Sequence, residues 1–130
     1  MLGDCHAHVI MDGKNYKEAV GLHKHGVKES VIYNCFSKYQ KAGVTLIRDG
    51  GDSLGVSKRA KELAPLYGIT YLTPIFAIHK AGHYGGIVGR SFETIEDYRQ
   101  LVLEAKSQGA DFIKIGIDKF LILIFYILFS

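Results

Sequence analysis

Two histidines separated by one residue follow the first strand-like segment of the chain. His6 and His8 lie in the stretch Asp4-Cys5-His6-Ala7-His8. Side chains two apart on an extended segment point to the same side, so both imidazoles can bind one divalent ion such as Zn²⁺ or Mn²⁺. The alternative is a pair of ordinary polar residues at a strand end. In either case, Cys5 should point the opposite way, into the packing.

A second His-x-His pair gives an internal comparison. His23 and His25 lie in a weakly helical segment, 16–25. Residues two apart on a helix point in directions about 200° apart, so these two imidazoles cannot share an ion. We expect this pair to form the solvated end of a helix.

Lys114 stands between two isoleucines on a strand-like segment that should be wholly buried. If Ile113 and Ile115 pack against helices, Lys114 points to the other side. A buried ammonium is costly unless it is paired or its pKa falls, and a neutral amine can take up CO₂ to form a carbamate. Such a group is carboxylate-like and can bridge two cations. The alternative is a lysine paired with an acid.

Three further residues are candidate substrate ligands. His79 and His83 lie in the Gly-rich stretch HKAGHYGG, a composition that favours a loop close to a ligand. A flexible loop with incidental histidines fits the same pattern equally well. Arg48 could hold an anionic substrate, or it could pair with Asp49 or Asp52.

The segments that must position these residues alternate between strand-like and helix-like patterns. We predict strands over 1–5, 44–47, 69–78 and 112–115, and helices over 27–43, 53–67 and 94–109. Ser53 and the capping box that starts at Thr94 should begin the last two helices, and Pro65 should weaken the end of the earlier one. This order predicts parallel strands with right-handed crossovers, in a doubly wound sheet or a (β/α)8 barrel.

In such α/β folds the working residues lie at the C-terminal ends of strands and in the loops that follow. The candidates fall near strands in four separate segments of the chain. A complete barrel needs about 250 residues. The 130 residues of this chain supply about its first four β/α units.

Composition excludes several classes of function. The net charge is +3 and the basic residues form no run, so we expect no nucleic-acid partner. Cys5 and Cys35 form no C-x-x-C pair, which favours a cytoplasmic setting. Residues 120–129 form an apolar run about half as long as the roughly 20 residues of a membrane span, so we expect no membrane association.

Three stretches of the sequence resemble the amidohydrolase superfamily, in its imidazolonepropionase-like and prolidase-like branch. They are DCHAH (4–8), GVTLIRDGG (43–51) and GADFIKI (109–115), and the resemblance covers residues 3–116. It implies a partial (β/α)8 TIM-type barrel over residues 1–118. The apolar tail, 119–130, does not look like native family sequence.

The resemblance also implies a site and a reaction. His6 and His8 would bind the first of one or two divalent metal ions, with Zn²⁺ expected, and carboxylated Lys114 would bridge them. The reaction would be hydrolysis of a C–N bond in a small-molecule amide, cyclic amide or dipeptide-like substrate.

The chain departs from the family pattern at its later strands. Two further metal-binding histidines and the catalytic Asp would come from strands beyond residue 118, so the catalytic residue is unknown. We therefore expect a truncated or frameshifted product that is inactive alone and associates with itself through the open barrel edge. The alternative is a non-catalytic relic or a partner-binding half-barrel.

Overall fold

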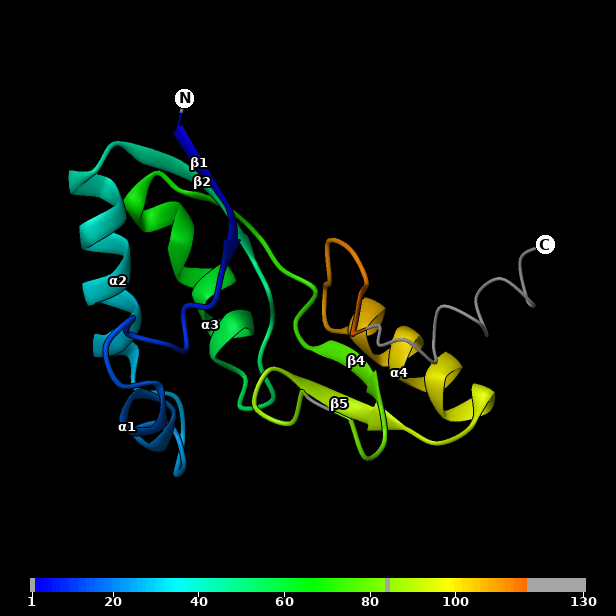
Figure 1. The fold of residues 1–130 in the computed structure, drawn as a ribbon. Helices are drawn as coiled ribbons and strands as arrows, with labels where there is room; N and C mark the ends of the chain where they lie inside the picture. Colours follow the sequence, from blue (N-terminus) through cyan, green and yellow to red (C-terminus); the bar gives the residue numbers. More distant parts are fainter. Residues whose placement is uncertain (1, 84, 117–130) are drawn as a thin grey trace.

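A computed structural model describes residues 2–83 and 85–116 and shows a mixed α/β fold (Figure 1). The elements in chain order are β1 (Leu2–Ala7), α1 (Tyr16–Gly21), α2 (Glu29–Lys41), β2 (Val44–Asp49), α3 (Val56–Leu63), the 3₁₀ helix η1 (Ala64–Tyr67), β3 (Thr70–Leu72), β4 (Ala77–Lys80), β5 (Gly89–Phe92), α4 (Ile95–Ser107) and β6 (Lys114–Gly116). The apolar tail predicted over 119–130 lies outside these residues.

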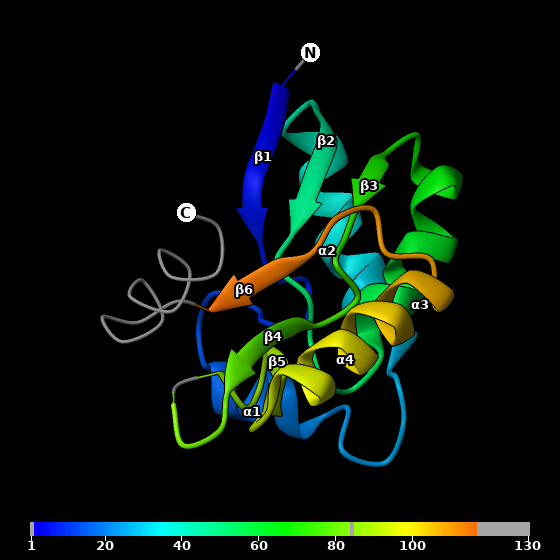
Figure 2. The ribbon, with the colours of Figure 1, turned by 90° about the vertical axis from the view of Figure 1, so that its right-hand side faces the viewer.

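The strands form two small parallel sheets. The first has the order β1-β2-β3 and the second has the order β5-β4-β6. Figure 2 shows β1, β2 and β3 side by side and pointing the same way, with the second sheet beyond their C-terminal ends. The α/β class with parallel strands is thus confirmed, but the described residues form no closed barrel.

The first sheet is covered on one face by α2 and α3. Phe36 of α2 is fully buried, and its ring centroid lies 5.5 Å from that of Tyr67 and 5.7 Å from that of Tyr71. Ile47 of β2 and Ala60 of α3 belong to the same core. This packing fixes the direction of β2, whose C-terminal end carries Arg48 and Asp49.

A bend interrupts the segment 69–78, which was predicted as a single strand. Pro74 has no N–H for a sheet, and the Thr73 hydroxyl accepts a hydrogen bond from the Ile75 N–H at 3.0 Å. Ile75 then takes a positive φ of 68°, which is uncommon for a β-branched residue. The bend separates β3 from β4, so each joins a different sheet.

Local signals predict the helix ends with mixed success. The capping box at Thr94 is present, and the turn that contains Pro65 is a 3₁₀ helix, as expected. Ser53, in contrast, does not cap α3, and its hydroxyl donates to the carbonyls of Gly86 and Ile87. The Asp52 carboxylate accepts instead the N–H groups of Val56 and Ser57, the first two residues of that helix, and the N–H of Leu54 just before it. The predicted helix is present, but it begins at Val56, three residues later than predicted, and Gly55 is its N-cap residue.

Asp111 joins the second sheet to the first. Its N–H donates to the Thr73 carbonyl at 2.9 Å, and its carboxylate accepts the Thr73 N–H at 2.9 Å. The same carboxylate pairs with Lys61 of α3 at 2.7 Å. These contacts fix the segment that leads into β6, and therefore the place of Lys114.

None of the helices in the described part of the chain is long and apolar enough to cross a membrane.

Candidate functional site

The C-terminal end of β1 carries an irregularity that re-aims its side chains. Asp4 pairs with Ile47 and Ala7 pairs with Asp49, so β1 uses one more residue than β2 over this interval. An extra residue of this kind is a β-bulge, which disturbs the alternation of side chains. Cys5 is accordingly exposed and lines the same cavity as His6, so the prediction that it packs inward is wrong.

The His8 ring is held by a backbone carbonyl. Its Nδ1 lies 3.1 Å from the Gly51 carbonyl oxygen and must carry a hydrogen to donate to it. The neutral ring then keeps its lone pair on Nε2, the atom that could bind an ion. Burial is the main cause that lowers the pKa of His8, and the nearby Lys114 charge adds to it. Both effects favour the neutral, ligand-competent imidazole.

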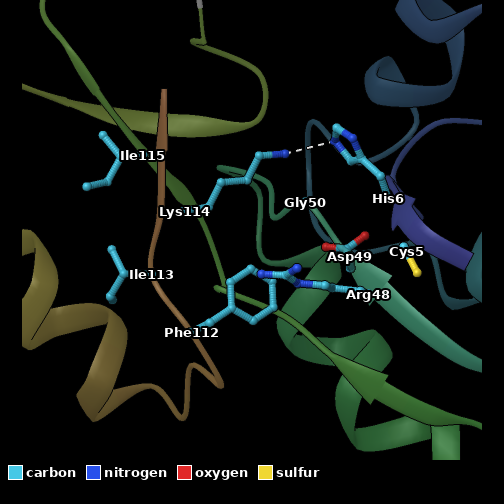
Figure 3. Close-up of a pocket in the computed structure, with 9 residues that line it drawn as sticks. All are labelled: Cys5, His6, Arg48, Asp49, Gly50, Phe112, Ile113, Lys114 and Ile115. Atoms are coloured by element: carbon cyan, nitrogen blue, oxygen red, sulfur yellow. Dashed lines mark hydrogen bonds between the residues drawn. The ribbon is translucent and has the colours of Figure 1, made fainter. Parts of the chain in front are cut away.

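Lys114 reaches across from β6 to the first histidine. Its Nζ lies 2.9 Å from Nε2 of His6, as the dashed line in Figure 3 shows. The ring centroids of His6 and His8 are 5.3 Å apart. Burial, helped by the neighbouring Arg48 charge, lowers the pKa of Lys114, although Asp49 opposes the shift. The structure thus brings together the three predicted metal ligands, while their binding of metal stays a prediction.

Gly50 makes this approach sterically feasible. A Cβ at this position would lie 2.3 Å from Cε1 and 2.5 Å from Nε2 of His8, and 2.7 Å from Nζ of Lys114. These contacts are shorter than real Cβ atoms show, so the side chains of His8 and Lys114 fill the space that any larger residue would need. Gly51 beside it has a φ of 83°, and its own Cβ would meet the Phe76 backbone at 2.9 Å. At both glycine positions of the Asp49-Gly50-Gly51 turn, a Cβ atom would therefore collide with neighbouring atoms.

The buried Asp49 carboxylate holds the Asp49-Gly50-Gly51 turn in place through hydrogen bonds. Asp49 is 1% exposed, and its carboxylate accepts hydrogen bonds from Val9 N–H at 3.0 Å, Gly51 N–H at 2.7 Å and the Ser57 hydroxyl at 2.6 Å. Val9 follows His8 directly, and Gly51 supplies the carbonyl that holds the His8 ring. From the sequence, Asp49 was predicted only as a possible partner for Arg48, because these hydrogen bonds join segments up to 40 positions apart.

A cavity of about 330 Å³, here called the β2–β6 cavity, opens beside the Lys114 side chain. It is lined by Cys5, His6, Arg48, Asp49, Gly50, Phe112, Ile113, Lys114 and Ile115. Figure 3 shows Lys114 directed toward His6, while the side chains of Ile113 and Ile115 point away from it. The side of β6 that carries the amine is therefore the side that faces the histidines.

Arg48 pairs with neither of the acids suggested by the sequence. Its guanidinium carbon lies 4.3 Å from the centroid of the Phe112 ring, over the ring face. Asp49 and Asp52 are buried and accept hydrogen bonds from N–H and hydroxyl groups instead. The Phe112 contact could not be read from sequence spacing, because it joins segments from two different sheets.

The two candidate histidines of the Gly-rich loop do not line this cavity. His79 is buried at the end of β4, and a Cβ on Gly85 would lie 2.7 Å from its ring. His83 is exposed in the turn that follows β4. Their assignment as substrate ligands stays a prediction.

The second His-x-His pair, His23 and His25, also differs from the prediction. His23 is 2% exposed, and its Nδ1 accepts the Lys28 N–H at 3.0 Å, whereas His25 is exposed. The solvated interpretation is therefore wrong for His23. Its ring holds the turn between α1 and α2, a contact that helical periodicity does not reveal.

The donor set limits what the site could hold. Within residues 2–83 and 85–116, no three His, Cys, Asp or Glu side chains lie close enough together to bind an ion. Two imidazoles suit a divalent metal, but a lysine ammonium repels one. Lys114 fits the set only as a neutral amine or as its carbamate.

No family model, curated protein or solved structure matches this chain.

Proposed function

We propose that the chain forms part of a metal-dependent hydrolase of C–N bonds, of the amidohydrolase kind, with a partial (β/α)8 barrel as its scaffold. The proposal rests on one observation: the side chains of His6, His8 and Lys114 lie close to one another, and those of His8 and Lys114 lie against Gly50. The resemblance of DCHAH, GVTLIRDGG and GADFIKI to that superfamily supports it from the sequence.

His6 and His8 would hold the divalent ion through their Nε2 atoms. The bound ion supplies a Lewis acid and lowers the pKa of water. The Gly51 carbonyl keeps Nε2 of His8 available by holding hydrogen on Nδ1. Nε2 of His6 becomes available when Lys114 gives up its hydrogen bond.

Lys114 would enter the site as a carbamate. Its neutral amine adds to CO₂, a C–N bond forms, and one proton leaves to solvent. The carbamate is anionic and would attract a cation, whereas the ammonium form of Lys114 would repel one. The lowered pKa of Lys114 favours the neutral amine that this step requires.

Metal binding to the intact chain tests the proposal. The chain is dialysed against a chelator, then titrated with Co²⁺ or Zn²⁺ in the presence and absence of bicarbonate. We expect stoichiometric binding that becomes tighter with bicarbonate. In His6→Ala and in His8→Ala the metal affinity should fall by at least about tenfold, since removing even a residue that only hydrogen-bonds to a ligand typically costs that much. His25→Ala, at an exposed histidine, is the matched control.

Binding that is absent, or that survives both histidine substitutions, would contradict the proposal. A screen of amides, cyclic amides and dipeptides then tests for hydrolysis.

A second candidate function is partner binding without catalysis. It is favoured by the position of β1, which among the described residues pairs on one side only. A groove of about 970 Å³ runs beside it, between β1, α1 and α2. Open edges of parallel sheets tend to pair with other chains, and we expect a second copy here. A monodisperse monomer across concentrations in light scattering would exclude this candidate.

A further inference from the structure

The Lys114 amine is bound to no carboxylate in the described part of the chain. Its Nζ lies 2.9 Å from Nε2 of His6 instead. Lys61 shows the contrast, because its Nζ pairs with a carboxylate oxygen of Asp111 at 2.7 Å. A lysine amine acts as a nucleophile through its nitrogen lone pair. When Lys114 donates a hydrogen to His6, that lone pair is left to react.

Nε2 of His6 is placed to take a proton from this amine. In a neutral imidazole the ring nitrogen without a hydrogen is an acceptor. A general base must lie within about 2.6–3.2 Å of the atom that gives up the proton, and the 2.9 Å contact meets this condition. The Asp4 carboxylate accepts the backbone N–H of His6 at 3.0 Å, which helps to hold this residue on β1. The pair therefore has the arrangement of a nucleophile with its base.

The β2–β6 cavity leaves room for a reaction partner beside the amine. Its volume of about 330 Å³ is at the lower end for small-molecule sites, so the partner must be small. Figure 3 shows the Phe112 ring and the Lys114 side chain on the same side of β6. The Arg48 guanidinium lies over one face of that ring at 4.3 Å from its centroid, which restrains the wall that both form. The Phe112 ring makes this wall partly apolar, which favours a partner with an apolar body.

We propose that Lys114 is a site of imine formation, at which the β2–β6 cavity takes a small aldehyde with an apolar body. The Nζ lone pair attacks the carbonyl carbon, a C–N bond forms, and the carbonyl oxygen takes up a proton from solvent. The nitrogen passes one proton to Nε2 of His6. The imidazolium returns that proton to the hydroxyl group, which leaves as water. The protonated C=N group then releases one proton to solvent, so amine and aldehyde become imine and water.

This activity goes beyond the proposed hydrolase function and needs the same neutral form of Lys114. A nitrogen that carries an imine cannot carry a carbamate. In the part that rests on the proposed function, an aldehyde bound at Lys114 would therefore prevent the carbamate from forming and would weaken metal binding. The imine itself needs neither metal nor CO₂.

Reductive trapping tests the inference on the intact, metal-free chain. Benzaldehyde is added with sodium cyanoborohydride, which reduces an imine to a stable secondary amine, and peptide mass spectrometry measures the rate at each lysine. We expect Lys114 to be labelled at least about tenfold faster than the exposed Lys24, because the cavity holds the aldehyde beside the amine. His6→Gln should slow labelling of Lys114 by at least about tenfold through loss of the base. His25→Gln, at an exposed histidine, should leave it unchanged.

Two controls separate the folded site from other causes. The chain unfolded in urea should label Lys114 and Lys24 equally, since the cavity is then lost. The His6→Gln rate is compared at conditions where urea titration shows that the variant is folded. Equal labelling of the two lysines in the folded chain, a preference that persists in urea, or an unchanged rate in folded His6→Gln would overturn the inference.

Bicarbonate distinguishes this inference from the proposed function. It should slow the labelling of Lys114, because CO₂ and the aldehyde compete for one nitrogen. Selective labelling that bicarbonate does not slow would support the imine site and would contradict the carbamate. Labelling of Lys114 no faster than that of Lys24, together with metal binding that bicarbonate tightens, would overturn the imine site and support the carbamate.

Discussion

Nζ of Lys114 lies 2.9 Å from Nε2 of His6, although the two residues are 108 positions apart in the sequence. The contact exists because Asp111 fixes the segment before β6 against Thr73 and Lys61. It also places the amine in competition with any ion for the same nitrogen of His6. Metal binding and the protonation state of Lys114 should therefore be coupled.

The first prediction concerns Gly50, whose missing side chain leaves room for the site. Gly50→Ala requires no positive φ, so the backbone tolerates it, but the new methyl group would displace the ends of His8 and Lys114. We expect Co²⁺ affinity to fall by at least about tenfold. Because both displaced groups are ends of flexible side chains, stability should fall by only about 1 kcal/mol, the lower end for overpacking.

Gly21→Ala is the matched control for this change. A Cβ at Gly21 meets nothing within 4 Å, and its φ also lies outside the left-handed region. We expect unchanged metal affinity and a small gain in stability from the better helix former. If Gly50→Ala bound Co²⁺ as tightly as the Gly21 variant, His8 and Lys114 would not form the site. Both affinities come from the same calorimetric titration.

The second prediction concerns the pH dependence of stability near Lys114. Burial holds the pKa of this lysine below its ordinary value of 10.5 in the folded chain. The unfolded chain therefore binds the proton more tightly, and this group makes the folded state more stable as pH rises toward about 10.5. Lys114→Met removes that contribution. We expect the variant to lose stability relative to the wild type as pH is raised from about 8 to about 10.

The difference between the two proteins is the quantity to measure, because other groups titrate in the same range. Burial raises the pKa of Cys35 to about 11, and it also raises the pKa of Tyr71. These acids make the folded state less stable as pH rises, which is the opposite sign. Urea unfolding of wild type and Lys114→Met over this range isolates the lysine. A pH-independent difference would contradict the lowered pKa.

Much of the secondary structure could be predicted because its signals are local. Val44 to Ile47 is rich in β-branched residues, and Thr94 forms a capping box with Asp97, only three residues further along the chain. The convergence of His6, His8 and Lys114 also followed from position, since each lies beside a strand of a parallel fold. Local propensity was sufficient for the strand and the helix start, and the rule of strand ends for His6 and His8, whereas Lys114 begins β6 and is not covered by that rule.

The features that could not be predicted depend on contacts between distant segments. The bulge in β1 reverses the direction expected for Cys5, and it exists only through the register with β2. The bend at Ile75 needs a positive φ that the Ile75 side chain disfavours and that the surrounding packing imposes. The strand β5 was missed because Arg90 and Ser91 break the apolar pattern on an edge strand.

The third prediction concerns Asp49 as the anchor of the His8 turn. Asp49→Asn replaces one acceptor oxygen by an NH₂ group, which must then face at least one of the four N–H and O–H groups that now donate to the carboxylate. Leaving a buried donor unsatisfied costs about 1–3 kcal/mol. We expect Asp49→Asn to lower the free energy of unfolding by at least about 2 kcal/mol in urea titration, and to weaken metal binding through His8.

Asp12→Asn provides the control for the third prediction. Asp12 is exposed, and both of its hydrogen bonds, from Lys14 N–H and Asn15 N–H, use the single oxygen Oδ1. An asparagine keeps that acceptor, so the change should stay within about 0.5 kcal/mol. Equal effects of the two substitutions would show that Asp49 is not the anchor.

The fourth prediction concerns acid sensitivity at the turn after α1. Burial lowers the pKa of His23 below 6.5, and nearby Asp52 only partly offsets this. Protonation would place a hydrogen on Nδ1, where the Lys28 N–H now donates at 3.0 Å, and would bury a charge. The unfolded chain binds this proton more readily, so the contribution of His23 to stability is lost as pH falls below about 6.5.

His8 contributes with the same sign, because its pKa is lowered as well. We expect wild-type stability to fall between about pH 6.5 and pH 5, before most carboxylates titrate, and His23→Gln to show a shallower fall. His23→Gln also disturbs a buried contact. The informative quantity is therefore the slope of the unfolding free energy with pH, and its absolute value is not informative. His25→Gln, at an exposed position two residues away, should keep the wild-type slope. If His23→Gln kept that slope too, the buried ring would not be the acid-sensitive element, and the loss would have to arise from His8.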